Sequence, residues 1–155
     1  MPNNKLSGES GEEEVIAKVV CPNCRKRLQK LPPGYPLFDL QCTACTFRVQ
    51  VKTNISKPKN EIFGATWDIL NKTLKAGQQV PPLIVFFKWL QWDTICTEIR
   101  FYPFIPRSNL RKRVLPPTGR NANLKMFNYI GLDKLPHFKW SGEAKRWESN
   151  TESAG

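Results

Sequence analysis

Residues 38–53, FDLQCTACTFRVQVKT, place two cysteines between two short segments that are rich in aromatic and β-branched side chains. Such segments favour β-strands, and the tight turn Cys42-x-x-Cys45 between them predicts an antiparallel hairpin. Because the side chains of a strand alternate between its two faces, Gln50 and Lys52 are expected to point to the same side. This hairpin is the element from which we derive both the fold and the chemistry.

Asp39 lies on the first of these strands, where closure of the hairpin brings its carboxylate beside Gln50 and Lys52. Carboxylate and amide oxygens hold hard cations, and a lysine can orient a water or stabilise charge on a phosphate. The candidate catalytic residues are therefore Asp39, Gln50 and Lys52, and the candidate Mg²⁺-binding residues are Asp39, Gln50 and Val51. On spacing alone, a solitary aspartate near a strand end and a solvated lysine explain the pattern equally well. The only histidine, His137, is expected at the surface rather than as a general base.

Four of the five cysteines form two Cys-x-x-Cys pairs, Cys21 with Cys24 and Cys42 with Cys45, separated by seventeen residues. This spacing is typical of a zinc ribbon, in which each pair supplies two thiolates from one tight turn. A redox pair is the alternative, but redox motifs rarely occur as two matched pairs. Four protein ligands leave no open coordination position, so we expect one structural Zn²⁺ per chain. The remaining Cys96 is interpreted as a buried thiol.

The 155 residues include 24 lysines and arginines against 13 acidic residues, which gives a formal charge of +11. Such an excess favours a polyanionic partner, above all nucleic acid, although basic surfaces also serve solubility alone. The candidate DNA-binding residues lie in a stretch without acidic neighbours and are Arg107, Arg111, Lys112, Arg113, Arg120 and Lys125. No segment reaches the roughly 20 apolar residues of a membrane span, and the polar start does not resemble a signal peptide, so a cytoplasmic protein is expected.

Hydrophobic periodicity predicts a single α/β domain over residues 1–140, with the zinc ribbon inserted at residues 21–45, and a polar, disordered tail over residues 141–155. Helices are expected at residues 8–20 and 62–75, where apolar residues recur at helical spacing. Besides the hairpin, strands are expected in the continuous apolar segment PPLIVFFKWL, in the alternating segment TICTEIRFY and in FNYIGL.

An acidic residue on one strand, followed by an acidic-x-Lys sequence on the next, is the signature of the PD-(D/E)XK nucleases, which this chain resembles. The cysteines narrow the resemblance to the DpnI-like, methylation-dependent restriction endonucleases, which carry a Cys-x-x-Cys pair at the same place. The resemblance covers residues 21–136 and includes the basic segment RKRVLPPTGRNANLKMFNYIGLDKLP. It implies an α/β restriction-endonuclease-like core, a mixed sheet flanked by helices, with an embedded four-cysteine zinc ribbon. The signature then falls on Asp39, Gln50 and Lys52.

One position departs from that signature, because Gln50 is neutral where the DpnI-like nucleases carry glutamate. A glutamine oxygen can bind a cation but adds no negative charge, so either the cation affinity falls or another carboxylate must help. Glu12 is the best candidate, since it precedes Ile16 by one turn on the core-facing side of the first predicted helix, and Glu13 is a weaker one. Both glutamates are explained equally well as favourable charges at a helix N-terminus.

The residues and the resemblance together predict a metal-dependent endonuclease that hydrolyses double-stranded DNA, with structural Zn²⁺ and catalytic Mg²⁺. Dependence on DNA methylation and a homodimeric state are compatible with the resemblance. Two alternatives remain open. One is a non-catalytic DNA-binding module of the same fold that has lost the cation through Gln50. The other is a zinc-ribbon adaptor for RNA or protein.

Overall fold

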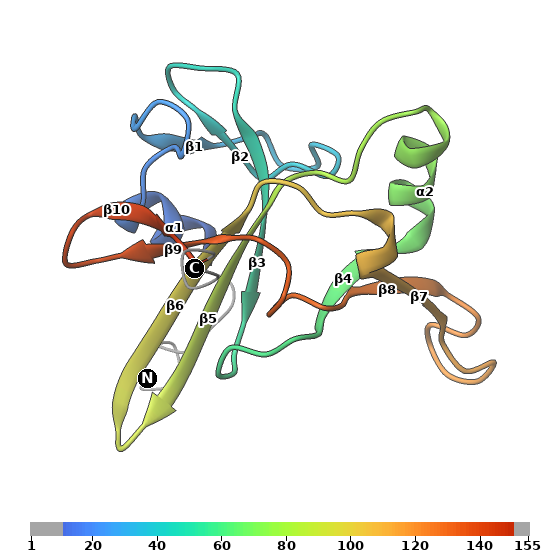
Figure 1. Cartoon of the computed structure of the whole chain (residues 1–155). Coiled ribbons are helices and arrows are strands. Elements are labelled where there is room, and N and C mark those ends of the chain that lie inside the picture. Colours follow the sequence, from blue (N-terminus) through green and yellow to red (C-terminus); the bar gives the residue numbers. More distant parts are fainter. Residues whose placement is uncertain (1–10, 151–155) are drawn as a thin grey trace.

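The computed structural model describes residues 11–150 and is predominantly β-structure (Figure 1). Strands account for 39% of the residues and helices for 14%, and the largest element is a curled mixed sheet. The predicted α/β restriction-endonuclease-like core, with helices flanking the sheet, was therefore wrong. Helix α1 ends two residues earlier and α2 begins five residues later than their patterns indicated, and several strands are too short to show a period of their own. No helix within residues 11–150 has the length and apolar character needed to cross a membrane.

The larger sheet has the strand order β1-β2-β3-β5-β6-β9-β10. Its neighbouring strands are antiparallel except for β3 and β5, which run parallel. The predicted hairpin is confirmed, because β2 and β3 pair with Leu40 opposite Val49, with Cys42 ending β2 and Cys45 in the connection. The strands of this sheet are β1 (Leu28–Lys30), β2 (Leu40–Cys42), β3 (Arg48–Asn54), β5 (Leu83–Gln91), β6 (Thr94–Tyr102), β9 (Phe138–Ser141) and β10 (Arg146–Ser149).

A second, three-stranded sheet has the order β4-β8-β7 and lies on the side of the molecule that carries α2 (Figure 1). Helix α2 continues directly from β4, so the helix predicted for residues 62–75 was wrong in its first five residues. Gly64 explains part of this error, because a Cβ there would meet the Phe127 ring of β8 at 2.3 Å. The elements of this part are β4 (Ile62–Thr66), α2 (Trp67–Lys75), the 3-10 helix η2 (Arg107–Asn109), β7 (Leu110–Val114) and β8 (Lys125–Tyr129).

Strand β5 carries the longest apolar run and separates two hydrophobic clusters. Ile84 and Phe86 join the cluster that contains α1 and the cysteine-bearing segments, whereas Leu83, Val85 and Phe87 join the cluster of α2 and the smaller sheet. The separation follows the two-residue period of a strand and confirms that PPLIVFFKWL forms a sheet centre. Strand β3 shares this division. Its valines belong to the first cluster, so its polar side chains face the second.

Helix α1 (Gly11–Lys18) covers the first cluster and begins against β3. A Cβ on Gly11 would lie 1.8 Å from Oγ1 of Thr53, so the helix can approach the strand this closely only with glycine at its start. The predicted helix over residues 8–20 agrees with the structure over residues 11–18, and residues 8–10 lie outside the described part. The contact holds the first turn of α1, which carries Glu12, close to β3.

Much of the predicted tail is folded, because β9 and β10 form a hairpin at the edge of the larger sheet. Trp147 packs on Phe101 with ring centroids 5.9 Å apart, and its indole N–H donates to the carbonyl of Val20 at 2.8 Å. The prediction of a disordered tail was therefore wrong for residues 141–149, and residues 151–155 lie outside the described part. The segment is polar in composition, but its aromatic side chains anchor the hairpin.

Candidate functional site: two clusters on one hairpin

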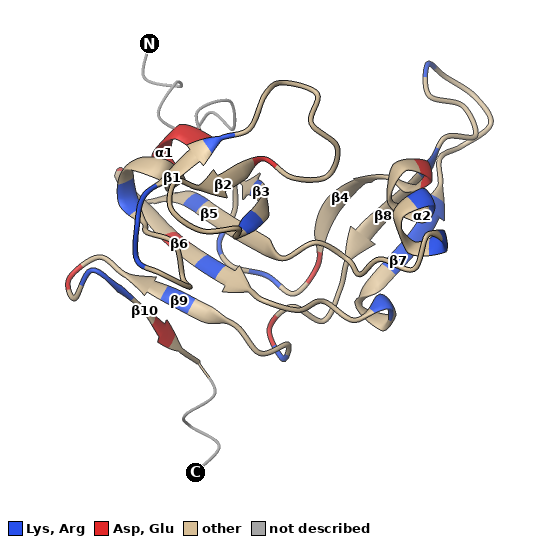
Figure 2. Cartoon of the chain, turned by 90° about the horizontal axis from the view of Figure 1, so that it is seen from above, with Lys and Arg blue, Asp and Glu red and all other residues tan. Residues whose placement is uncertain are grey.

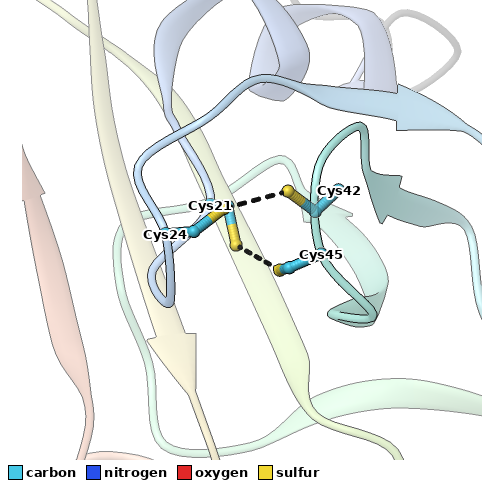
Figure 3. A group of neighbouring side chains, drawn as sticks. All are labelled: Cys21, Cys24, Cys42 and Cys45. Carbon is cyan, nitrogen blue, oxygen red and sulfur yellow. Dashed lines mark hydrogen bonds between the residues drawn. The ribbon is translucent and has the colours of Figure 1, made fainter.

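The two Cys-x-x-Cys pairs meet at the turn end of the β2–β3 hairpin (Figure 3). Their four sulfurs all lie within 4.8 Å of one another, with Cys21 Sγ 3.6 Å from Cys45 Sγ and Cys24 Sγ 3.3 Å from Cys42 Sγ. Four thiolates around one tetrahedral Zn²⁺, with bonds of about 2.3 Å, would stand about 3.8 Å apart. The four cysteines are therefore positioned to hold one metal ion.

Backbone N–H groups point at the cysteine sulfurs. The N–H of Asn23 lies 3.4 Å from Cys21 Sγ, and the N–H of Ala44 lies 3.3 Å from Cys42 Sγ. Although burial opposes ionisation, the N–H of Ala44 and the Cys24 thiol lower the pKa of Cys42 to about 7. Burial raises the pKa of Cys21 to about 12. A metal ion would displace these protons, so metal binding here is coupled to pH.

Backbone contacts join the two cysteine turns independently of any metal. The N–H of Thr43 donates to the carbonyl of Arg27 at 3.0 Å, and the hydroxyl of Thr43 donates to the same carbonyl at 3.1 Å. Cys21 and Cys42 are also buried in the first hydrophobic cluster. The cysteine cluster therefore fixes the turn of the hairpin to the segment before it.

Asp39 stands at the opposite, open end of the same hairpin. Its carboxylate Oδ2 accepts the N–H of Val51 at 2.7 Å, and its own N–H donates to the carbonyl of Val49 at 2.9 Å. Burial raises the pKa of Asp39, although the Val51 N–H and the Lys52 charge act in the other direction. The side chain is thus fixed against the backbone edge of β3, just before β2 begins at Leu40.

Glu12 and Lys52 both lie within electrostatic reach of Asp39. Burial, followed by the negative charge of Asp39, raises the pKa of Glu12. Burial lowers the pKa of Lys52, and the charge of Asp39 partly offsets this shift. Glu13 points elsewhere, because its carboxylate forms an ion pair with Lys30 at 2.7 Å. Helix α1 therefore brings one of the two candidate glutamates toward Asp39 and directs the next one away.

Gln50 is buried beside this group, and its Oε1 accepts the phenolic O–H of Tyr129 at 2.8 Å. Burial and then the negative charge of Asp39 raise the pKa of Tyr129, so the phenol keeps its proton and remains a donor. This partner was missed in the sequence. It lies 79 residues away on β8, and no local pattern indicates that its hydroxyl reaches β3.

The polar atoms of this second cluster include oxygens of the kind that bind hard cations. The N–H of Val51 points to Asp39, and because the N–H and C=O of one strand residue project to the same edge, the Val51 carbonyl is directed there too. With the carboxylates of Glu12 and Asp39 and the amide oxygen of Gln50, this set contains the ligands that Mg²⁺ prefers. The raised pKa values of Glu12 and Asp39 reflect burial that a cation would offset. We call Glu12, Asp39, Gln50 and Lys52 the acidic cluster.

Most predicted DNA-binding residues lie together on the smaller sheet. Figure 2 shows Lys and Arg along β7 and at the tip of the loop that follows it, where Arg120 is the only basic residue. Arg107 serves a different purpose, because its guanidinium donates to the Leu74 carbonyl of α2 at 3.0 Å. The exposed basic residues of the smaller sheet are Arg111, Lys112, Arg113 and Lys125.

His137 is buried, so the prediction of a surface histidine was wrong. Its Nδ1 lies 2.8 Å from the carbonyl of Leu135, and its ring packs on Tyr102 with centroids 4.8 Å apart. The folded end of the chain covers it, since the backbone N–H of His137 donates to Oδ1 of Asn150 at 3.0 Å. This histidine is buried because the β9–β10 hairpin is folded, which the polar composition of the segment did not predict.

One hairpin therefore carries two clusters with different chemistry, sulfur at its turn and oxygen at its open end. The sulfur cluster suits a closed tetrahedral site, and the oxygen cluster suits a cation that keeps positions for water or a phosphate. No protein-family model matches the chain, and no curated protein matches its sequence. The function has to be inferred from these two clusters and from the charge of the surface around them.

Proposed function

We propose that this protein is a divalent-cation-dependent DNA endonuclease that hydrolyses phosphodiesters at the acidic cluster. The observation that carries the proposal is that Glu12 of α1, with Gln50 and Lys52 of β3, surrounds Asp39, the residue before β2. In an ion-pair network that serves stability alone, neighbouring cations lower carboxyl pKa values. Here burial raises the pKa of both Glu12 and Asp39. Lys30 and Lys52 act on these pKa values in the other direction, so burial is the opposing factor that a bound cation would offset.

Each residue of the cluster has a distinct role in this proposal. Glu12, Asp39, Gln50 and the Val51 carbonyl would hold Mg²⁺, which supplies Lewis acidity to the scissile phosphate and to a water. The Val51 N–H fixes the Asp39 carboxylate, and the Tyr129 hydroxyl fixes the Gln50 amide. Lys52 orients the attacking water and stabilises the negative charge that develops on the phosphate. Burial also lowers the pKa of Lys52, which is the direction that favours proton transfer to or from that water.

We assign structural Zn²⁺ to the four-cysteine cluster. Soft thiolates select Zn²⁺ over Mg²⁺, and four of them leave no position for a reactive water. This ion would hold the hairpin turn, and thereby the register that sets Asp39 against Val51. Support comes from the Sγ atoms, which all lie within 4.8 Å of one another.

Double-stranded DNA is the proposed substrate because the chain carries a formal charge of +11 and exposes four basic side chains on the smaller sheet. Phosphate neutralisation by such residues dominates affinity for DNA and makes it depend on salt. One observation favours a second candidate, a module that binds DNA without cutting it. Because Gln50 is neutral, the cluster has one negative charge fewer than it would have with glutamate at this position.

The test is Mg²⁺-dependent nicking of supercoiled plasmid, methylated and unmethylated, by zinc-loaded protein. Lys52→Met removes the ammonium but keeps the stem, and we expect it to slow cleavage by about 100-fold or more. The control Lys57→Met removes an exposed lysine a few residues further on. Equal rates for wild type and Lys52→Met would contradict the assigned roles. Absence of nicking by the wild type with any divalent cation would favour the non-catalytic module.

A further inference from the structure

Phe63 is an exposed aromatic ring with two cations beside it. The residue is 46% exposed, Nζ of Lys52 lies 5.8 Å from its ring centroid, and Cζ of Arg113 lies 6.0 Å from the same point. These residues come from β4, β3 and β7, so three separate segments converge on one ring. Since Ile62 and Gly64 on either side are buried, Phe63 is the residue of this strand segment that faces solvent.

The register of the smaller sheet shows which residues share a face with this ring. Phe63 stands opposite Asn128 of β8, and Asn128 stands opposite Arg111 of β7. Cross-strand partners lie on the same face, and Arg113, two residues beyond Arg111, lies there as well. The other face carries Phe127 and packs into the second hydrophobic cluster. Phe63, Arg111 and Arg113 therefore share one face of the sheet, opposite the face through which Phe127 packs into the core.

The charges on this surface are unevenly balanced. Arg111 forms an ion pair with Glu61 at 3.1 Å, and Glu61 also accepts a hydrogen bond from Asn128 at 2.8 Å. Among residues 11–150, no ion pair involves Arg113. Its contact with the Phe63 ring is worth only about 0.5–1 kcal/mol at an exposed site, so an arriving phosphate can draw the guanidinium away from the ring.

We propose that Phe63 is a stacking platform for the base of an unpaired nucleotide, whose phosphates are bound by Arg113 and Lys52; this rests on the proposed endonuclease function. Bases inside a duplex present only their edges, so a ring face can be used only by a base that has left the stack. Lys52 belongs both to this surface and to the acidic cluster. The unpaired nucleotide would therefore lie next to the phosphodiester that is cut.

The test is fluorescence-anisotropy binding of zinc-loaded protein, without Mg²⁺, to three DNA probes. They are a blunt duplex, the same duplex with a single-stranded tail, and the tailed duplex with abasic positions in the tail. The variants are Phe63→Ala, Phe63→Trp and the control Phe104→Ala. The control truncates a phenylalanine that is 52% exposed in the loop between β6 and η2. Thermal unfolding checks that each variant is folded.

We expect Phe63→Ala to weaken binding of the tailed duplex about fivefold or more, whereas Phe63→Trp and Phe104→Ala bind it like the wild type. Abasic positions should lower the affinity of the wild type for the tail by a similar factor. They should not change the affinity of Phe63→Ala, because this variant has already lost the stacking contact. The proposal is overturned if folded Phe63→Ala binds the tail as tightly as the wild type. It is also overturned if the affinity of this variant falls by the same factor for all three probes.

The same samples separate this inference from the endonuclease itself. If the wild type binds the tail through Phe63 but never nicks plasmid with Mg²⁺, the stacking surface stands and the endonuclease proposal fails. If plasmid is nicked and binding of the tail does not depend on Phe63, the endonuclease stands and the stacking platform fails. If the wild type binds none of the three probes, both are overturned.

Discussion

The two ends of the β2–β3 hairpin are only a few residues apart in sequence, yet they present opposite kinds of ligand. At the turn, four cysteines bring their sulfurs within 4.8 Å of one another. At the open end, Asp39 and Glu12 are accompanied by the amide of Gln50 and the ammonium of Lys52. The turn end can saturate a metal ion with protein ligands, whereas the open end cannot.

On the proposed function, the difference predicts that one small element separates stability from chemistry. Strand pairing ends at Leu40 opposite Val49, and the next part of the β3 edge is free to meet the Asp39 carboxylate through the Val51 N–H. The turn end is therefore expected to respond to mutation by unfolding. The open end should lose cation binding and cleavage while the protein stays folded.

The largest expected effect is that of Cys42→Ser at the turn end. Structural Zn²⁺ contributes an apparent 10–16 kcal/mol, roughly, in small zinc domains, which is comparable to the whole stability of a domain. We expect loss of bound zinc and loss of cooperative unfolding, measured by metal analysis and circular dichroism. The control Cys96→Ser changes the cysteine outside the cluster and should retain one zinc per chain. A folded, zinc-free Cys42→Ser protein would show that the turn needs no metal.

A smaller effect is expected from the matched pair Glu12→Gln and Glu13→Gln. Glu12 lies within electrostatic reach of Asp39, whereas Glu13 is paired with Lys30 at 2.7 Å. Glu12→Gln should weaken Mg²⁺ binding by about tenfold or more, a loss already typical of residues that only support a metal ligand. Glu13→Gln should leave the affinity unchanged. Isothermal titration calorimetry on zinc-loaded protein measures both, and equal affinities would remove Glu12 from the site.

The smallest effect is the dependence of cation affinity on pH. The pKa values of Glu12 and Asp39 are raised from 4.5 and 3.8, so both carboxyl groups keep protons at a higher pH than usual. Because Mg²⁺ binds the deprotonated groups, its affinity should begin to fall on acidification while the pH is still above 4.5. Zinc content must be followed in parallel, since acid also protonates thiolates. An affinity that stays constant down to pH 4.5 would contradict the assigned ligands.

Features that depend on neighbours in sequence could be predicted. The hairpin, the cysteine cluster, the sheet centre at β5 and the strand β6 each follow from a pattern within about ten residues. The alternation that places the valines of β3 on one face also predicted that Gln50 and Lys52 point to the same side. Glu12 was a candidate only through its helical spacing from Ile16, and the close contact of Gly11 with Thr53 explains how it reaches β3.

Features that depend on tertiary contacts could not be predicted. Strand β4 has the spacing of a helix, and only pairing with β8 decides its conformation. The β9–β10 hairpin is polar in composition, but Trp147 anchors it on Phe101. Tyr129 reaches Gln50 of β3 across 79 residues, and Phe63 meets Lys52 from a strand of the other sheet, so neither contact is encoded in a local pattern.

The central claim is that the acidic cluster binds a hard cation at the open end of the hairpin, and Mn²⁺ binding measured by electron paramagnetic resonance tests it most directly. Zinc-loaded wild type and Asp39→Ala are titrated with Mn²⁺ in the presence of a short DNA duplex, with DNA alone as the blank. We expect one protein-dependent Mn²⁺ per chain in the wild type and its loss in Asp39→Ala, while DNA binding and zinc content stay unchanged. Equal Mn²⁺ binding by the two proteins, or none beyond that of DNA alone, would contradict the account.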